Sequence, residues 1–221
     1  MASLCACGSV VDGGYLGKPL YTLRGSIHGS LPNVALTRPK MAVVWTSGYQ
    51  GAVTVETTPL EAQFPQDFTL DVFHTPPDYE FVNFTVGSRF ALGNLVAFED
   101  VNDNGKLDTA SLSVALGADV SPDRFFGYSP SDFIFVVDGE PQLTAERASQ
   151  FVNPQALHRG WNLLRFCRLL PVAGYTSVLG QVFDIGAPAQ LNVVPPASHI
   201  THAPAIWQLD VVAPDELAPC P

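Results

Sequence analysis

The stretch Phe68-Thr-Leu-Asp-Val72 alternates apolar and polar side chains, which is the pattern of a half-buried β-strand. Phe68, Leu70 and Val72 fall on one face of such a strand, and Thr69 and Asp71 fall on the other. Successive side chains of a strand point to opposite faces, so this pattern predicts one face against a core and one face in water.

Further segments have the same strand-like character and are separated by Gly, Pro, Asn and Asp residues typical of turns. Met41-Ala-Val-Val-Trp45 is apolar on both faces and predicts a central strand. The other predicted strands are residues 21–27, 53–55, 68–72, 81–86, 95–98, 133–137, 161–167, 190–194 and 206–212. Residues 143–152 alone have helical character, over two or three turns. This spacing predicts an all-β fold, an immunoglobulin-like or transthyretin-like β-sandwich with a C-terminal β extension and at most one short helix.

The composition excludes several classes of protein. Of the 221 residues, 47% are hydrophobic and 14% are charged, which argues against intrinsic disorder. The 19 prolines and 18 glycines argue against a helical bundle, because both residues penalise helices. A net charge of -10 argues against a nucleic-acid partner, since such binding depends on Lys and Arg.

The stretch Asp100-Val-Asn-Asp-Asn-Gly-Lys-Leu-Asp108 matches the first nine positions of an EF-hand-type calcium loop. Gly105 occupies position 6, where the chain must turn sharply, and Leu107 is expected to tie the loop to the core. Ca²⁺ prefers oxygen ligands, and this loop offers them at alternate positions. The predicted ligands are side-chain oxygens of Asp100, Asn102, Asn104 and Asp108 and the backbone carbonyl of Lys106.

Two features depart from an EF-hand. Position 12 is Ser111 instead of a bidentate Glu, so the missing ligand would come from elsewhere, with Glu99, Asp123 and Asp138 as candidates. The preceding segment also alternates like a strand. The alternative is a plain hairpin, because Asn104-Gly105 is itself a strong turn signal.

The loop resembles the strand-borne Asp-x-Asn-x-Asn-Gly loops of extracellular β-sandwich modules, such as the calcium-binding B-repeats of bacterial adhesins. It is also similar to dockerin loops, which lie on helices. The resemblance implies a structural calcium ion, bound with a dissociation constant of about 10⁻⁴–10⁻³ M.

The four residues Leu4-Cys-Ala-Cys7 resemble a bacterial lipobox. The resemblance implies that Cys7 receives a lipid and anchors the protein to a membrane; the alternative is two ordinary cysteines in a flexible terminus. If Cys5 is removed and Cys7 is lipidated, Cys167 and Cys220 remain and can form a disulfide that closes a loop of about 50 residues, worth about 3–4 kcal/mol. Two reduced, buried thiols in a cytosolic protein are the alternative.

Most of the chain resembles uncharacterised lipoproteins of Gram-negative bacteria. The shared features are the lipobox Cys, the segments Gly17–Leu20, Ala42–Trp45 and Phe64–Leu70, the acidic Asn-Gly loop and a Cys near the C-terminus. The resemblance implies an outer-membrane or cell-surface location, or the periplasmic side of the membrane. The expected organisation is a lipobox remnant and tether in residues 1–17, a β-sandwich with the calcium loop in 18–120, and a β-rich half in 121–221, packed as one unit in preference to two domains.

The expected function is a non-enzymatic, lipid-anchored envelope module that binds a protein or polysaccharide. The sequence contains no Gly-x-Ser-x-Gly, P-loop or His-Glu-x-x-His motif. One alternative is a structural subunit of a larger envelope assembly. Another is a transition-metal protein that uses His199 and His202, or a hydrolase with an unrecognised site. Four aromatic residues are candidates for ligand contact where they are exposed: Trp161, Trp207, Tyr128 and Tyr175.

Overall fold

A computed structural model describes residues 17–31, 33–45, 53–108, 123–168, 178–184, 186–197 and 219–221. Several sequence-based predictions lie outside these residues: lipidation of Cys7, the position-12 residue Ser111, the histidines His199 and His202, the aromatics Tyr175 and Trp207, and the strand at 206–212.

The described residues form ten strands and three short helical segments. The strands are β1 (Tyr21–His28), β2 (Pro39–Trp45), β3 (Val53–Pro59), β4 (Gln66–Val72), β5 (Val82–Thr85), β6 (Ser88–Glu99), β7 (Arg124–Asp138), β8 (Gly160–Arg168), β9 (Val178–Asp184) and β10 (Ala189–Ala197). The helical segments are η1 (Asp78–Glu80), α2 (Ala145–Ala148) and η2 (Pro154–Ala156). The prediction of an all-β, sandwich-like fold is therefore confirmed. In the part of the chain that the structure describes, no helix has the length and apolar character needed to cross a membrane.

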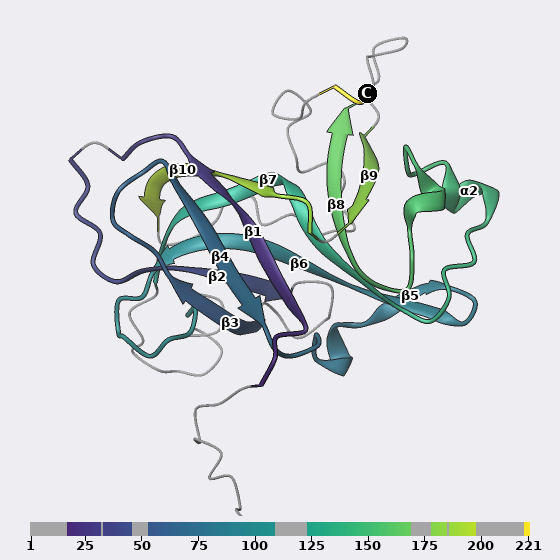
Figure 1. Cartoon of the computed structure of the whole chain (residues 1–221), viewed down its shortest axis with the longest axis horizontal. Coiled ribbons are helices and arrows are strands. Elements are labelled where there is room, and N and C mark those ends of the chain that lie inside the picture. The colour runs from purple at the N-terminus through teal and green to yellow at the C-terminus, as the bar shows by residue number, and fades with distance from the viewer. Residues whose placement is uncertain are drawn as a thin grey trace, which may run out of the picture.

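All ten strands belong to one hydrogen-bonded sheet that folds over its own core (Figure 1). The main path runs β3-β2-β6-β7-β10-β1-β4, in which β1 and β10 are parallel and the other neighbours are antiparallel. β1 and β4 lie in front of β2, β3 and β6 in Figure 1, so the two ends of the path form the two layers of the sandwich.

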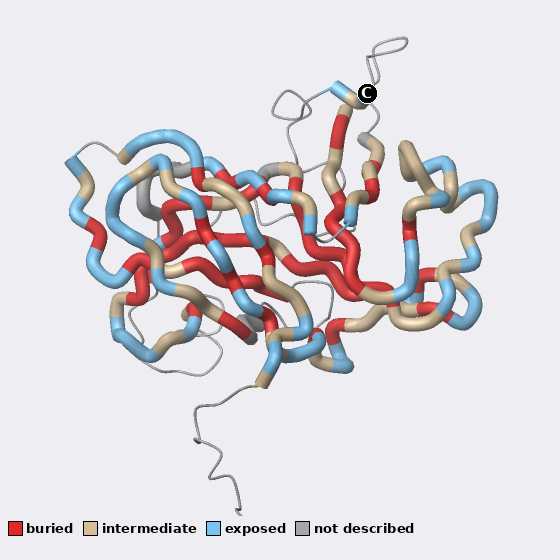
Figure 2. The backbone as a smooth tube through the Cα atoms, viewed as in Figure 1, coloured by how far each residue is buried: buried red, intermediate tan, exposed pale blue. Residues whose placement is uncertain are grey.

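The main core lies between these layers, where the buried segments of facing strands meet (Figure 2). The alternation in β4 holds as predicted: Phe68, Leu70 and Val72 are buried, and the residues between them are exposed. β2 pairs with β3 on one side and β6 on the other, which confirms it as a central strand. Its side chains are buried on both faces because Ala42 and Val44 pack in a separate cluster on the outer face.

β6 and β7 are longer than predicted and extend beyond the sandwich, where they carry β5, β8 and β9. A second apolar core, which includes Phe90, Phe135 and Leu164, fills this extension. The predicted helix at 143–152 is wrong in length: α2 has four residues, after which the chain straightens and bridges to β9. β9 was not predicted, because Gly180 interrupts its apolar pattern.

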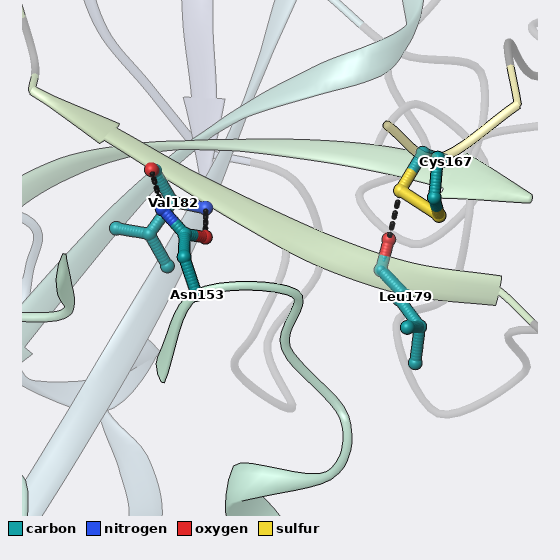
Figure 3. Close-up of a disulfide and its surroundings, with 5 residues drawn as sticks. Asn153, Cys167, Leu179 and Val182 are labelled. Carbon is teal, nitrogen blue, oxygen red and sulfur yellow. Dashed lines mark hydrogen bonds between the residues drawn. A yellow bond between two sulfur atoms is a disulfide. The ribbon is translucent and has the colours of Figure 1, made fainter. Parts of the chain in front are cut away.

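The outer edge of β9 is covered by residues that follow α2. The N–H of Gly180 donates to the carbonyl of Gln150, and the N–H of Val152 donates to the carbonyl of Gly180. The Asn153 side chain then takes the place of a strand, because its amide pairs with both the N–H and the carbonyl of Val182, at 2.8 and 2.7 Å (Figure 3). Covering an edge in this way blocks pairing with another chain.

β8 and β9 form an arm, and this arm carries the disulfide between Cys167 and Cys220, which confirms the predicted pairing (Figure 3). The bond joins β8 to the last residues of the sequence, and the N–H of Cys220 donates to the carbonyl of Arg168 at 2.8 Å. Residues 53 positions apart are thereby fixed side by side.

Candidate metal centre

The predicted calcium loop begins where β6 ends, so it follows a strand, as the sequence indicates. Gly105 has a φ of 76°, the left-handed conformation that position 6 requires and that glycine adopts without strain. Leu107 is buried against the outer cluster that includes Phe98 and Phe125. The loop is therefore anchored at its end by an apolar side chain, in agreement with the sequence-based expectation.

Asp100 organises the first half of the loop from a fully buried position. Its Oδ2 accepts the N–H of Gly105 at 2.9 Å, and its Oδ1 accepts the N–H of Asn104 at 3.2 Å. Lys40 of β2 also donates to Oδ2, at 2.7 Å. Burial alone would raise the pKa of Asp100, but the hydrogen bond and charge of Lys40 and the two N–H groups outweigh burial and hold the pKa below its usual value.

Three of the predicted ligand side chains converge on one point. The Nδ2 atoms of Asn102 and Asn104 donate to Oδ2 of Asp108, at 2.7 and 2.8 Å. Positions 3, 5 and 9 of the loop therefore lie within hydrogen-bonding distance of one another. The fifth predicted ligand, Lys106, lies on the same loop with an exposed side chain, and its N–H donates to Oδ1 of Asn104 at 2.8 Å.

Asp123, which precedes β7, holds the loop by accepting two of its backbone N–H groups. Its Oδ1 accepts the N–H of Val101 and its Oδ2 accepts the N–H of Asp108, both at 2.8 Å. Burial raises the pKa of this carboxyl above its usual value, and the nearby charges of Asp108 and Asp100 act in the same direction, against the two N–H groups. Of the three candidates for the missing position-12 ligand, Asp123 is the one whose carboxylate contacts the backbone of the loop.

The other two candidates are engaged elsewhere. Glu99 accepts hydrogen bonds from the backbone and hydroxyl of Thr37 and pairs with Arg124. Asp138 pairs with Arg89, at the opposite end of β6 from the loop. Since β6 has 12 residues, that end lies about 35 Å away at the usual rise of a strand.

Sequence reasoning missed three residues that contact the loop from β2, β3 and the turn before β2. Arg38 donates to the carbonyls of Asp100 and Val101, and it lies 3.4 Å from the Asp103 carboxylate. Thr57 donates its hydroxyl to the carbonyl of Gly105 at 3.1 Å. Lys40 is the third. These residues lie 48 to 65 positions from their partners, so no local motif could indicate them.

Basic residues from other parts of the chain neutralise three acids in and next to the loop. Glu99 pairs with Arg124, Asp100 with Lys40, and Asp103 with Arg38. Within the described ranges, no Lys or Arg pairs with Asp108. Among the described residues near the loop, the negative charge without a basic partner is therefore that of Asp108 and Asp123.

No three His, Cys, Asp or Glu side chains among the described residues are grouped closely enough to hold a metal by themselves. A cation in this loop would depend on amide and carbonyl oxygens as much as on carboxylates, which suits Ca²⁺ and not a transition metal.

Trp161, one of the aromatic residues proposed to contact a ligand if exposed, does not meet that condition. Trp161 is buried between Tyr21 and Trp45, with ring centroids 4.7 and 5.8 Å away, so it is not an exposed platform.

Comparisons with protein-family models, curated proteins and solved structures found no match to this chain.

Proposed function

We propose that this chain is an exported, lipid-anchored and non-enzymatic protein of the cell envelope, in which residues 100–108 bind a structural calcium ion. The observation that carries the proposal is the convergence of Asn102, Asn104 and Asp108 on one point that lacks a basic partner among the described residues.

The donor set suits a hard cation. A half turn of the Asn102 and Asn104 amides would present Oδ1 in place of Nδ2 to the point where both now meet Asp108. This turn exchanges the N–H groups of Asn104 and Lys106, which the two Oδ1 atoms now accept, for the cation. With Asp100 and the Lys106 carbonyl, the loop would then offer five oxygen donors, and water could supply the rest. Ca²⁺ takes six to eight oxygens and tolerates irregular geometry, whereas Mg²⁺ demands a near-ideal octahedron.

Bound calcium would offset the charge of Asp108, whose N–H is already held by Asp123 at the start of β7. Such a cation is structural, because it stiffens residues 100–108 at the end of β6. In this proposal the envelope module then presents a stable surface to a protein or polysaccharide.

The disulfide supports the proposed export. Disulfides persist in oxidising compartments and are rare in the cytosol, and Cys167–Cys220 joins distant parts of this chain.

The lipid anchor on Cys7 rests on the lipobox resemblance. Metabolic labelling of the native protein with a palmitate analogue tests it: the label should be lost in Cys7→Ser and kept in Cys5→Ser.

Thermal denaturation tests the calcium site. With a dissociation constant of about 10⁻⁴–10⁻³ M, about 10 mM Ca²⁺ should stabilise the protein by about 1.4–2.7 kcal/mol. For a chain of this size that corresponds to a rise in Tm of about 3–10 °C over the protein in chelator.

The matched variants are Asp108→Asn, which should lose the calcium-dependent rise, and Asp67→Asn, which should keep it. Asp67 is an exposed carboxylate on β4, and the substitution removes the same charge far from the loop in sequence. An equal Tm in calcium and in chelator for the wild type would rule out the site.

A further inference from the structure

Lys40 is the one cation that contacts a predicted ligand side chain among the described residues. It is the second residue of β2, and its side chain is 19% exposed, whereas that of Asp100 is completely buried. The ammonium lies 2.7 Å from Oδ2 of Asp100. It also lies 3.9 Å from the position that a Cβ would take on Gly105, and so rests against the turn of the loop.

This ammonium has a clear role in the metal-free protein. A buried carboxylate without a counter-ion is strongly destabilising, and two backbone N–H groups supply only part of the compensation. Lys40 supplies the opposite charge. Its strand is fixed on both sides by β3 and β6, so the ammonium is delivered to Asp100 from a rigid element.

The same ammonium opposes a second cation. A divalent ion bound to Asp100 would share that carboxylate with a positive charge about 3–5 Å away, where repulsion is substantial even at an effective dielectric constant of about 20. Either the ammonium withdraws or the ion binds more weakly than its oxygen ligands alone would allow.

We infer that Lys40 sets the calcium affinity of the loop: it is the internal counter-ion of Asp100 without metal, and calcium binding displaces it. The inference rests on the proposed calcium function and adds its regulation. Calcium binding is then an exchange of one cation for another. The loop keeps its fold in both states, and its affinity is held low, which suits a compartment rich in calcium.

Isothermal titration with CaCl₂ at low ionic strength tests the inference, using chelator-treated wild type, Lys40→Met and Lys18→Met. Lys40→Met should bind calcium about tenfold more tightly than wild type, or better. Lys18→Met removes the same charge from an exposed side chain that contributes no ligand to the loop. Its affinity should stay within about threefold of wild type, because the charge is screened.

A second pair of variants keeps the test decisive. Lys40→Gln retains a hydrogen-bond donor without the charge, and its affinity should rise as in Lys40→Met; it is the variant to measure if Lys40→Met does not fold without calcium. Lys40→Arg keeps the charge and should stay within about threefold of wild type. In chelator, Lys40→Met should melt below wild type, and saturating calcium should remove most of that difference.

The outcomes separate the two proposals. If wild type binds calcium and both Lys40→Met and Lys40→Gln bind with the same affinity, the inference about Lys40 is wrong and the calcium function stands. If only the Lys40 variants bind, Lys40 suppresses the site and the calcium function of the wild type fails. If no form binds at about 10 mM Ca²⁺, both proposals fail.

Discussion

The loop at residues 100–108 is an irregular segment held against the sheet. The arm formed by β8 and β9 likewise holds irregular segments, those after α2 and at the last residues, but by different chemistry. The loop is held by carboxylates: Asp100 and Asp123 together accept four backbone N–H groups. The outer edge and the end of the arm are held by uncharged contacts, the Asn153 amide on Val182 and the disulfide, while an ion pair between Arg165 and Asp132 joins β8 to β7.

The difference has a physical consequence. Charged contacts respond to pH, salt and cations, and Asp100 can exchange Lys40 for another cation. A covalent bond and neutral hydrogen bonds respond to none of these. Sensitivity to calcium should therefore be confined to the loop, and redox sensitivity to the arm.

The largest expected effect comes from opening the disulfide. Cys167→Ala combined with Cys220→Ala should lower the free energy of unfolding by about 4 kcal/mol, because the bond closes a loop of 53 residues. Urea denaturation with and without reductant measures the loss, and reduction should affect the wild type alone.

The calcium-dependent rise in Tm should survive in this double variant. Loss of that rise on opening the disulfide would mean that the loop and the arm are coupled and do not respond independently.

Asp123→Asn should be the most damaging single substitution at the loop's base. An amide can accept one of the two N–H groups that Asp123 now accepts, and its own NH₂ then faces the N–H of Val101 or of Asp108. We expect a loss of about 1–3 kcal/mol by urea denaturation. Asp67→Asn should change stability by less than about 0.5 kcal/mol, and equal losses in the two variants would show that Asp123 does not brace the loop.

Asn153→Ala should weaken the arm by about 1–2 kcal/mol, because it leaves the N–H and carbonyl of Val182 without their partner. The uncovered edge of β9 should also promote self-association, which light scattering detects. Asn83→Ala is the control, since Asn83 is exposed on β5. Faster hydrogen exchange at Val182 in Asn153→Ala alone is expected; unchanged exchange would mean that the amide does not protect this edge.

The smallest expected effect is the pH dependence of Glu99. Burial acts to raise its pKa, but the Thr37 and Arg124 contacts hold the pKa below the ordinary 4.5. A carboxyl whose folded pKa is lowered stabilises the protein above its unfolded pKa, and loses that contribution as pH falls through the folded pKa.

Glu99→Gln should therefore cost about 1 kcal/mol at pH 7. The gap to wild type should close as pH falls below about 4.5. Melting both proteins in chelator across this range measures it, and a gap independent of pH would exclude an electrostatic origin.

Sequence patterns predicted what depends on local periodicity. The alternation at 68–72 and the double-sided apolar stretch at 41–45 gave β4 and β2, since burial on one or both faces leaves its mark in consecutive residues. The strand β9 was not predicted, because Gly180 interrupts its apolar pattern. Its outer edge is paired by the side chain of Asn153, 29 positions away in sequence, which no local pattern indicates.

The candidate site shows the same division. The loop's own residues follow a spacing that can be read from the sequence, including the glycine at position 6. Lys40, Arg38 and Thr57 reach the loop only through strand pairing, and nothing in their own neighbourhoods marks them. The basic partners of Glu99, Asp100 and Asp103 are equally distant in sequence, so the neutralisation of these three acids could not be predicted from the loop itself.

The most direct test is a calcium titration of the uniformly ¹⁵N-labelled protein followed by amide NMR. The N–H groups of Asn104 and Gly105, which donate to Asp100, should shift progressively and saturate, while those of Gly180 and Val182 in the arm should stay in place. Loop amides that do not move at about 10 mM Ca²⁺, or shifts of equal size in loop and arm, would contradict a calcium site at residues 100–108.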